Sequence, residues 1–393
     1  MVATFEPTRS AGLARLAGFV PRSGRAYAAE RNHDRGPDGH TSVSRLSPYL
    51  RHRLVLEREV IAAVTERYAL STADKFVNEV YWRTYFKGFL ERRPTIWSHY
   101  RARLAAHREA VARDGALARD LAAAEAGETG IDAFDHWARE LDDTAYLHNH
   151  ARMWFASIWI FTLRLPWELG ADLFLRRLVD GDPASNTLSW RWVAGLHTKG
   201  RTYLARADNI ARYTEGRVRA TGLATAAPPL TEEVDHPLRP VPDPPPVPDG
   251  AVLWLITEED CASEDLAAGA NVAGALATVS AADRSHGEVA PTVLAFTRGA
   301  VADAAARCGA PSPVPLDGDA LVAAAREART DVIAFSYAPV GPVADRLAAA
   351  RPGLSSAGVR LVPVLRPEDP PAWQQSDRGF FKLRKAIPRL VAA

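Results

Sequence analysis

Residues 146–192 read YLHNHARMWFASIWIFTLRLPWELGADLFLRRLVDGDPASNTLSWRW and combine a helical apolar pattern with polar side chains that an ordinary core would not contain. The apolar residues recur at three- and four-residue spacing, which predicts helices. The polar residues among the tryptophans of this stretch are Asn149, Arg152, Asp180, Asp182 and Asn186. Polar groups that leave water need partners, because each group left unpaired costs roughly several kcal/mol. The stretch therefore predicts a buried pocket for a large polar ligand.

The whole chain sets broad limits on the class of protein. With 393 residues it is long enough for two domains, since single domains usually have about 100 to 200 residues. Lys and Arg total 48 against 47 Asp and Glu, so the net charge of +1 gives no general attraction to nucleic acid. A DNA-binding surface would have to be a local patch.

Two sequence features bear on the compartment. The chain has two cysteines and no signal-peptide pattern, which favours a reducing environment, and we expect a cytoplasmic protein. The most apolar run, residues 153–163, is about half the length that a bilayer requires. We therefore expect a buried helix there and no membrane span.

The composition divides the chain into four segments. Residues 1–40 have no sustained period and predict a lead-in segment that becomes ordered only by docking. Residues 41–224 show helical patterns without any strand signal, which predicts an all-helical domain. Residues 225–250 are so rich in proline that they predict an extended linker. Residues 251–393 form the fourth segment.

The fourth segment predicts a smaller, Rossmann-like α/β domain with a parallel sheet. Short runs rich in β-branched residues predict buried strands at residues 252–256, 292–296, 331–336 and 359–365. Alanine-rich stretches predict helices at about residues 264–280, 298–308, 318–329 and 340–350. The tail GFFKLRKAIPRL, residues 379–390, returns to a helical pattern, and we expect it to pack back on one of the two domains.

Two further stretches of the helical domain carry chemistry. Residues 41–50, TSVSRLSPYL, place hydroxyl groups before a helix, where they can cap it or can equally bind phosphate. Residues 75–94, KFVNEVYWRTYFKGFLERRP, predict a helix on which Glu79 and Trp82 share one strip beside that of Arg83. Both stretches lie upstream of the opening one.

Five motifs occur in order along the helical part, namely SRLSPYL, EVYWR, LHNHARM, DGDPASN and WRW. Together they resemble the FAD-binding helical domain of the photolyase and cryptochrome family, over residues 27 to about 215. The resemblance implies a bound FAD and an electron transfer, driven by light, from reduced FAD to a pyrimidine dimer in damaged DNA. In that family the α/β domain comes first, whereas here it follows the helical domain, so the order is swapped. For this reason the resemblance does not extend to an antenna chromophore.

The resemblance also implies which residues contact FAD. Ser44, Leu46 and Ser47 would cradle its diphosphate, and Asn186 would face the flavin N5, where a carboxamide can donate or accept a hydrogen bond and so tune the redox state. Arg152 and Asp180 would form an ion pair over the isoalloxazine. The full implied set is Tyr27, Ser44, Leu46, Ser47, Arg83, Asn149, Arg152, Asp180, Gly181, Asp182 and Asn186.

Electron carriers follow from the same resemblance. Trp190 matches the tryptophan nearest the flavin, and Trp167 matches the second carrier. The third carrier is missing from its usual segment, since residues 105–130 contain neither Trp nor Tyr. Trp137, Trp154 or Trp159 would have to replace it. Packing in the core stays an alternative explanation for Trp167 and Trp190.

The implied substrate pocket consists of Glu79, Trp82, Tyr146, Met153 and Trp192. Glu79 would hydrogen-bond the damaged bases and Trp82 would stack on a flipped dimer, although both could be simple packing residues. Tyr146 stands where the family often has a second tryptophan. Phosphate contacts around the pocket would come from local cations, for which Arg45, Arg51, Arg191 and Lys199 are candidates.

Other functions stay open at this point. One is a cryptochrome-like blue-light photoreceptor that signals through the flavin redox state and binds a protein partner through the α/β domain or the linker. Another is a flavoenzyme that acts on a small molecule. The letters HNH at residues 148–150, with His33 or His40, could indicate a metal site, but histidines two apart on a helix point to different faces. We expect no metal.

Overall fold

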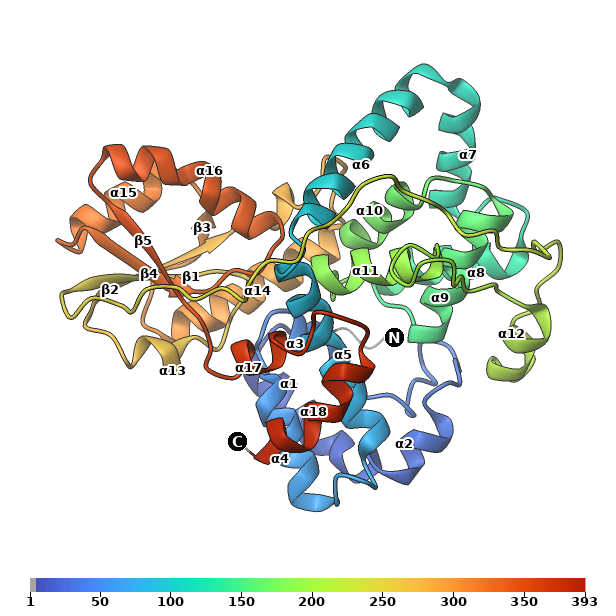
Figure 1. Ribbon diagram of the computed structural model, residues 1–393, viewed down its shortest axis with the longest axis horizontal. Helices are drawn as coiled ribbons and strands as arrows, with labels where there is room; N and C mark the ends of the chain where they lie inside the picture. The colour runs from blue at the N-terminus through green and yellow to red at the C-terminus, as the bar shows by residue number, and fades with distance from the viewer. Residues whose placement is uncertain (1–4, 393) are drawn as a thin grey trace.

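A computed structural model describes residues 5–392 and shows a helical domain joined to a smaller α/β domain (Figure 1). The helical domain contains no strand among those residues, as the sequence predicts. Its elements are α1 (Arg9–Phe19), the 3-10 turn η1 (Val20–Arg22), α2 (Arg25–Glu30), α3 (Ser47–Arg51), α4 (Glu57–Arg67), α5 (Asp74–Glu91), α6 (Thr95–Arg113), α7 (Gly115–Ala126), α8 (Asp132–Thr144), α9 (Asn149–Ser157), the π-helical turn η2 (Ile158–Thr162), α10 (Trp167–Arg177), α11 (Pro183–Val193) and α12 (Ala207–Tyr213).

The lead-in segment carries two α-helices, α1 and α2, which pack on the rest of the chain. Thr8 caps α1 by accepting a hydrogen bond from the backbone N–H of Ala11, at 3.2 Å. Leu16 and Phe19 of α1 and Tyr27 of α2 are buried in a core that includes residues of both domains. These few buried apolar residues are enough to stabilise α1 and α2, since most helical stability in proteins comes from packing rather than from local propensity.

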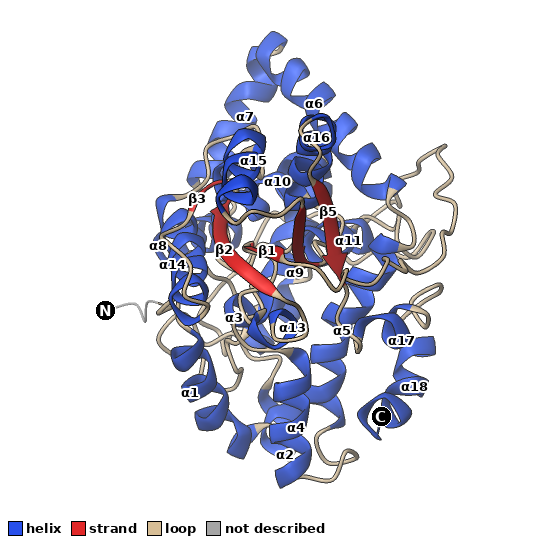
Figure 2. Ribbon diagram, turned by 90° about the vertical axis from the view of Figure 1, so that its left-hand side faces the viewer, coloured by secondary structure: helices blue, strands red, loops and turns tan. Residues whose placement is uncertain are grey.

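The α/β domain has a five-stranded parallel sheet, in the order β3-β2-β1-β4-β5, and all strands of residues 5–392 belong to it (Figure 2). Its strands are β1 (Val252–Ile256), β2 (Val272–Val279), β3 (Val314–Pro315), β4 (Val332–Ser336) and β5 (Arg360–Val364). Its helices are α13 (Glu264–Ala267), the 3-10 turn η3 (Ala281–Asp283), α14 (Pro291–Arg307), α15 (Gly318–Glu327), α16 (Pro342–Ser356), α17 (Asp369–Trp373) and α18 (Phe381–Ala392).

Two predicted elements of the α/β domain are wrong. Residues 292–296 belong to helix α14, where Pro291 occupies the first turn and buried Val293, Phe296 and Ala300 continue the helical spacing. Residues 272–279 form strand β2 inside the stretch predicted as a helix. The alanines of β2 favour a helix locally, but its parallel pairing with β1 overrides that preference.

The two faces of the sheet have different neighbours. Helices α15 and α16 pack on one face, and α14 packs on the other together with residues of the helical domain. In Figure 1, α15 and α16 lie above the strands and α13 and α14 lie below them. The helical domain therefore meets the sheet across α14, and the site described below lies close to this junction.

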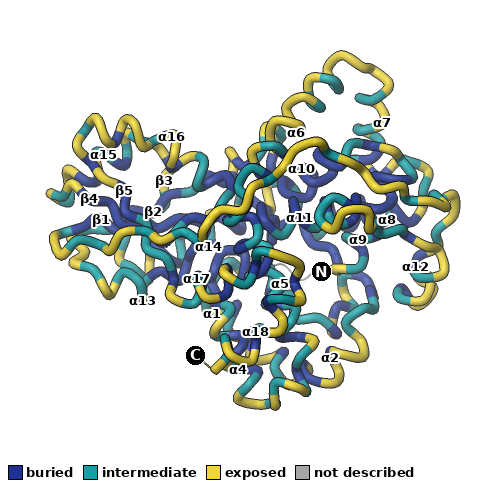
Figure 3. Tube along the Cα trace, viewed as in Figure 1, coloured by how far each residue is buried: buried dark blue, intermediate teal, exposed yellow. Residues whose placement is uncertain are grey.

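Residues 225–250 run along the helical domain as an extended, largely exposed chain without helix or strand (Figure 3). Two backbone hydrogen bonds hold this linker, from Leu230 to Ala194 and from Arg239 to Arg92. Beyond the sheet, α17 and α18 return to the helical domain and pack on α5. Of the residues described, no helix has the length and apolar character that crossing a membrane requires.

Candidate functional site

An ion pair between Arg152 of α9 and Asp180, in the turn between α10 and α11, lies at the centre of the predicted pocket. Arg152 Nη2 donates to Asp180 Oδ2 at 2.8 Å, and Arg152 Nε donates to the Leu147 carbonyl at 2.9 Å. Burial alone would lower the pKa of Arg152, but the charge of Asp180 raises it above its ordinary value. The second oxygen of Asp180 is buried and has no hydrogen-bond partner within residues 5–392. That oxygen is ready to accept from a ligand.

Tyr146 connects this ion pair to the hydroxyl-rich segment. The guanidinium groups of Arg45 and Arg152 each lie 5.3 Å from the centre of the Tyr146 ring. Burial raises the pKa of Tyr146 to about 12, so its phenol stays neutral. Two further hydroxyls, those of Ser42 and Ser185, are buried without a hydrogen-bond partner in the described chain. Asp180, Ser42 and Ser185 thus each have a buried oxygen without a hydrogen-bond partner among residues 5–392.

The predicted phosphate residues lie at the start of α3. Ser44 Oγ accepts from the backbone N–H of Leu46 at 3.3 Å, so this hydroxyl closes a local turn. Leu46 is buried in the core, and Ser47 is the first residue of α3. Only backbone groups and the serine hydroxyls of this segment can therefore reach a ligand.

Arg83 and Asp182 belong to a second cluster of charges, at the junction of the two domains. Arg83 Nη2 donates to Asp182 Oδ2 at 3.2 Å, and Lys87 Nζ lies 3.5 Å from the same oxygen. Burial would raise the pKa of Asp182, but Lys87, Arg83 and Arg51 hold it far below its usual value. Asp182 also caps α11 by accepting from Ser185 N at 2.8 Å. A buried carboxylate is stabilised in this way by several donors.

The second cluster extends into the α/β domain. Arg51 donates to both oxygens of Glu259, at 2.7 and 2.8 Å, and its Nε donates to the Gly181 carbonyl at 2.9 Å. Lys87 Nζ lies 3.8 Å from Glu259. The acidic residues after β1 thus neutralise cations of the helical domain.

Two predicted DNA contacts are wrong for the same reason. Arg51 is buried in its pair with Glu259, and Arg191 is buried in a pair with Glu232 of the linker. Neither cation can reach a phosphate. Of the other two candidates, Lys199 is exposed and Arg45 is partly buried.

Asn186 and Asn149 have different surroundings. Asn186, on α11, donates from Nδ2 to the carbonyl of Ala171 at 2.7 Å, so the amide is held in one orientation and its oxygen is left to accept. Asn149 is the exposed first residue of α9. The predicted role of Asn186 at a flavin is compatible with a fixed amide, and it stays a prediction.

Glu79 and Tyr27 lie in a third group, around Arg31. Arg31 forms an ion pair with Glu79 of α5. Burial nevertheless raises the pKa of Glu79, although Arg31 opposes the shift. The ring of Tyr27 meets Phe19 and Phe76 edge-on and is part of the core. Glu79 is therefore already paired with a residue of the chain itself.

The aromatic residues of the predicted substrate pocket each stack on a different partner. Trp82 lies on Phe380, with ring centroids 3.8 Å apart, and Trp192 stacks on Tyr203 at 5.7 Å. No ring contact joins Trp82, Tyr146 and Trp192 in the part of the chain that the structure describes. Met153 is partly buried on α9. These five residues do not form a closed wall here.

Trp190 and Trp167 both lie in the core of the helical domain. Trp190 meets Trp159 edge-on at 6.1 Å, whereas the neighbour of the Trp167 ring is Tyr100 at 5.6 Å. A Cβ at Gly170 would lie 2.3 Å from the Trp190 ring, so α10 needs a glycine to approach this closely. Of the three proposed replacements for the missing carrier, Trp159 is in ring contact with Trp190, while Trp137 stacks on Trp154 at 5.3 Å.

Sequence reasoning missed three residues of these clusters, namely Arg31, Lys87 and Glu259. Lys87 follows Arg83 by one helical turn, and this spacing could have indicated a shared partner. Glu259 is the third residue after a buried parallel strand, at the edge of the sheet where site residues gather in α/β folds. A hollow of about 530 Å³ in the α/β domain is lined by Asp317 and Arg346, and none of the predicted site residues lines it.

Comparison with known proteins bears on the helical domain. A family model described as the FAD binding domain of DNA photolyase matches residues 76–216. This part of the chain is therefore similar to the FAD-binding domain of DNA photolyases. The chain is 32% identical over 225 residues to a deoxyribodipyrimidine photo-lyase of Streptomyces griseus, which covers 53% of the chain and 48% of that protein. It is 36% identical over 200 residues to the photo-lyase of Thermus thermophilus, covering 50% of the chain and 45% of that protein.

Two solved structures, a cryptochrome and a photolyase, are similar to this chain. A cryptochrome of Synechocystis sp. PCC6803 has a TM-score of 0.45 and 23% identity, covering 55% of the chain and 44% of that structure. A class III photolyase of Agrobacterium tumefaciens has a TM-score of 0.42 and 24% identity, covering 52% and 44%. The chain spans about half the length of the curated relatives that it matches.

The residues of this photolyase-type domain fit its cofactor, FAD. The cofactor carries a diphosphate, hydroxyls and ring nitrogens that need both donors and acceptors. The unpartnered oxygens of Asp180, Ser42 and Ser185 can supply acceptors and hydroxyl donors. Arg152 and Arg45, with Tyr146 between them, supply positive charge in a largely buried setting.

Proposed function

We propose that the protein is a photolyase-like flavoenzyme, a lyase that uses light to split pyrimidine dimers in damaged DNA. The observation that carries the proposal is the match of residues 76–216 to the FAD binding domain of DNA photolyase. The buried pair of Arg152 and Asp180, with an acceptor oxygen left free, supports a cofactor at that place. The named photo-lyases of Streptomyces griseus and Thermus thermophilus support the reaction.

In this proposal the chain binds and orients the cofactor through its own polar groups. Arg152 is held by Asp180 and Leu147, so its charge has a fixed position. Asn186 is anchored on Ala171, and its amide oxygen would be the group that accepts a hydrogen bond from the flavin ring. FAD, when bound and reduced, supplies the electron that blue light releases. The protein contributes position, charge and the exclusion of water.

Substrate recognition would use α5. Glu79 and Trp82 lie three residues apart on this helix, so they share one side of it. A flipped dimer needs an aromatic face and a hydrogen-bonding group, which these two residues offer. In the structure Arg31 pairs with Glu79 and Phe380 covers Trp82. Both contacts would have to break before the lesion could bind.

That last observation favours a second candidate, a flavoprotein that senses light and signals to a protein partner. In this case the contact between Trp82 and Phe380 is a permanent part of the interface between α5 and the C-terminal helices. The exposed linker and the α/β domain would then be available for the partner. The lesion would not be a ligand.

One experiment decides between the two candidates. The purified full chain is loaded with FAD, reduced without oxygen and mixed with an oligonucleotide that contains a cyclobutane dimer. We expect loss of the dimer under blue light and none in the dark. Intact dimer after illumination, with the flavin band showing full occupancy, would reject the repair reaction. Light-dependent change in hydrodynamic radius without repair would favour the photoreceptor.

A further inference from the structure

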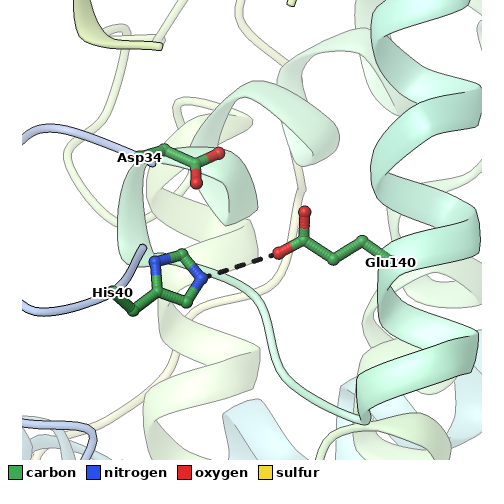
Figure 4. A group of neighbouring side chains, drawn as sticks. All are labelled: Asp34, His40 and Glu140. Atoms are coloured by element: carbon green, nitrogen blue, oxygen red, sulfur yellow. Dashed lines mark ion pairs between the residues drawn. The ribbon is translucent and has the colours of Figure 1, made fainter. Parts of the chain in front are cut away.

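Asp34, His40 and Glu140 form a buried cluster that the proposed function does not use. Asp34 and His40 lie in the loop between α2 and α3, and Glu140 lies on α8. One ligand atom of each residue lies within 4.8 Å of the others, and the three residues are 0%, 6% and 5% exposed. Figure 4 shows the imidazole edge and the two carboxylates turned toward a common space.

The hydrogen bonds of this cluster are incomplete. Neither ring nitrogen of His40 and neither carboxylate oxygen of Glu140 has a hydrogen-bond partner among residues 5–392. His40 Nε2 and Glu140 Oε1 are 3.7 Å apart, which is too long for a hydrogen bond. Buried polar groups are nearly always satisfied, so two adjacent unsatisfied side chains indicate a missing partner.

Asp34, by contrast, is held in place by its neighbours. It accepts from Gly36 N at 3.0 Å and from Trp137 Nε1 at 3.2 Å, and Arg217 lies 3.1 Å from Oδ1. Contacts of this kind orient the ligands of metal sites. The buried carboxylates of Asp34 and Glu140 thus lie close together, and the guanidinium of Arg217 pairs with Asp34. A cation would stabilise this arrangement.

The chemistry of the three side chains narrows the choice of cation. One imidazole nitrogen and two carboxylate oxygens suit a transition metal such as Zn²⁺, and Ca²⁺ or Mg²⁺ would prefer oxygen ligands alone. Two atoms bound to one Zn²⁺ at about 2.0 to 2.2 Å lie roughly 3.4 Å apart in a tetrahedral site. The distance of 3.7 Å between His40 and Glu140 is close to that value.

Two further histidines neighbour the site. His136 Nε2 lies 3.7 Å from Glu140 Oε2 and 2.7 Å from Arg217 Nη1, so this nitrogen already has a partner. His148 stacks on His40 with ring centroids 5.6 Å apart, but its Nδ1 accepts from His150 N and its Nε2 contacts the Arg31 carbonyl. His148 is therefore not a ligand, and the three candidate ligands are His40, Asp34 of the same loop and Glu140 of α8.

We propose that Asp34, His40 and Glu140 bind one divalent transition-metal ion, with Zn²⁺ as the expected ion, and that the ion fastens the loop between α2 and α3 to helix α8. Three protein ligands leave a fourth position for water. This inference replaces the expectation of no metal site. The role is structural, and it does not depend on the proposed repair reaction.

The test measures metal binding on the full chain after treatment with a chelator. Isothermal titration with ZnCl₂, with and without FAD, is expected to show one site per chain, which elemental analysis of the dialysed protein would confirm. Glu140→Gln and His40→Asn should each weaken binding at least a hundredfold. Glu128→Gln and His286→Asn change exposed residues of the same types and should leave the site intact.

A second readout keeps the test valid when a variant folds poorly. Co²⁺ bound at the wild-type site should give visible absorption bands typical of a four-coordinate ion, and Zn²⁺ should displace it. The competing explanation is a protonated His40 paired with Glu140 without metal. Zn²⁺ binding no tighter in wild type than in Glu140→Gln, together with a His40 ring that titrates in nitrogen-15 spectra, would overturn the proposal. Neither of these two readouts measures repair activity.

Discussion

Phe380 lies flat on the indole of Trp82, with ring centroids 3.8 Å apart and ring planes inclined by 13°. Trp82 belongs to α5, on which the photolyase-type residues Glu79 and Arg83 also lie, whereas Phe380 directly precedes α18 at the end of the chain. Through this contact the C-terminal tail of the α/β domain covers the aromatic face that a damaged base would need. A residue that follows the sheet thus contacts the predicted substrate site directly.

Replacing Phe380 with alanine should uncover Trp82. Base stacking on an aromatic side chain contributes about 1 to 3 kcal/mol, so we expect DNA with a dimer to bind about tenfold more tightly to Phe380→Ala than to wild type. The variant should also lose roughly 3 to 5 kcal/mol of unfolding free energy, because Phe380 is buried. Fluorescence anisotropy and urea unfolding measure the two effects.

Phe381 offers the matched control for this variant. It is the next residue along the chain, it is 71% exposed, and its ring has no contact with Trp82 in the described structure. Phe381→Ala should change neither DNA affinity nor stability appreciably. Unchanged DNA affinity in Phe380→Ala, with lowered stability, would show that the contact is only structural and would support the photoreceptor.

Asp180→Asn tests the cofactor site. Breaking a buried ion pair costs about 3 to 5 kcal/mol, because Arg152 keeps its charge without a partner. We expect FAD affinity to fall at least tenfold, measured by the flavin absorption that stays with the protein after gel filtration. Asp142→Asn is the control, since Asp142 pairs with Arg177 at an exposed place. Equal flavin retention in both variants would contradict the assignment of Asp180.

The tryptophans of the core can be separated by their ring contacts. Trp159 touches Trp190, whereas Trp137 stacks on Trp154, away from Trp190. If electrons reach the flavin through Trp190, Trp159→Phe should slow the light-driven reduction of bound FAD about tenfold, and Trp137→Phe should slow it little. The flavin absorption, recorded during illumination in the presence of an external reductant, measures this rate. Equal rates in the two variants would remove Trp159 from the path.

Much of the fold follows from the sequence because the local signals agree with the packing. The helices of residues 41–224 and the extended linker agree with apolar spacing and proline content. Strand β2 and the start of α14 do not agree with their local sequence. The alanines of β2 favour a helix, and the β-branched residues at the start of α14 favour a strand. Sheet pairing and burial decide these two cases, and neither can be seen in a local window.

The candidate site, too, is only partly predictable from the sequence. The pairing of Arg152 with Asp180 is implied by the family resemblance, and the structure places the two side chains 2.8 Å apart. The partners of Arg51 and Trp82, which are Glu259 and Phe380, come from the other domain, 208 and 298 residues further along the chain. Both partners lie outside residues 76–216, which match the photolyase family model, so the resemblance holds no information about these contacts. They depend on how the domains dock.

Glu91 gives a prediction for pH, because it connects α5 to the α/β domain. Its carboxylate accepts from the Tyr337 hydroxyl at 2.8 Å and from the backbone N–H of Val340. Burial raises the pKa of Glu91 from its ordinary value of 4.5 to about 7, although both hydrogen bonds oppose the shift. The folded protein therefore holds a proton that the unfolded chain releases, so this contribution to stability is complete below pH 4.5 and is lost as the pH rises through 7.

Glu91→Gln keeps this side chain neutral at every pH, so it should be less sensitive to pH than the wild type. Between pH 5 and pH 8 we expect the wild type to lose up to about 3 kcal/mol of unfolding free energy relative to the variant. Urea unfolding across this range measures the difference. Glu66→Gln, which changes an exposed residue of α4, should follow the wild-type curve. If Glu91→Gln also follows it, the proton at the domain junction is not on Glu91, and docking of the two domains does not depend on its protonation.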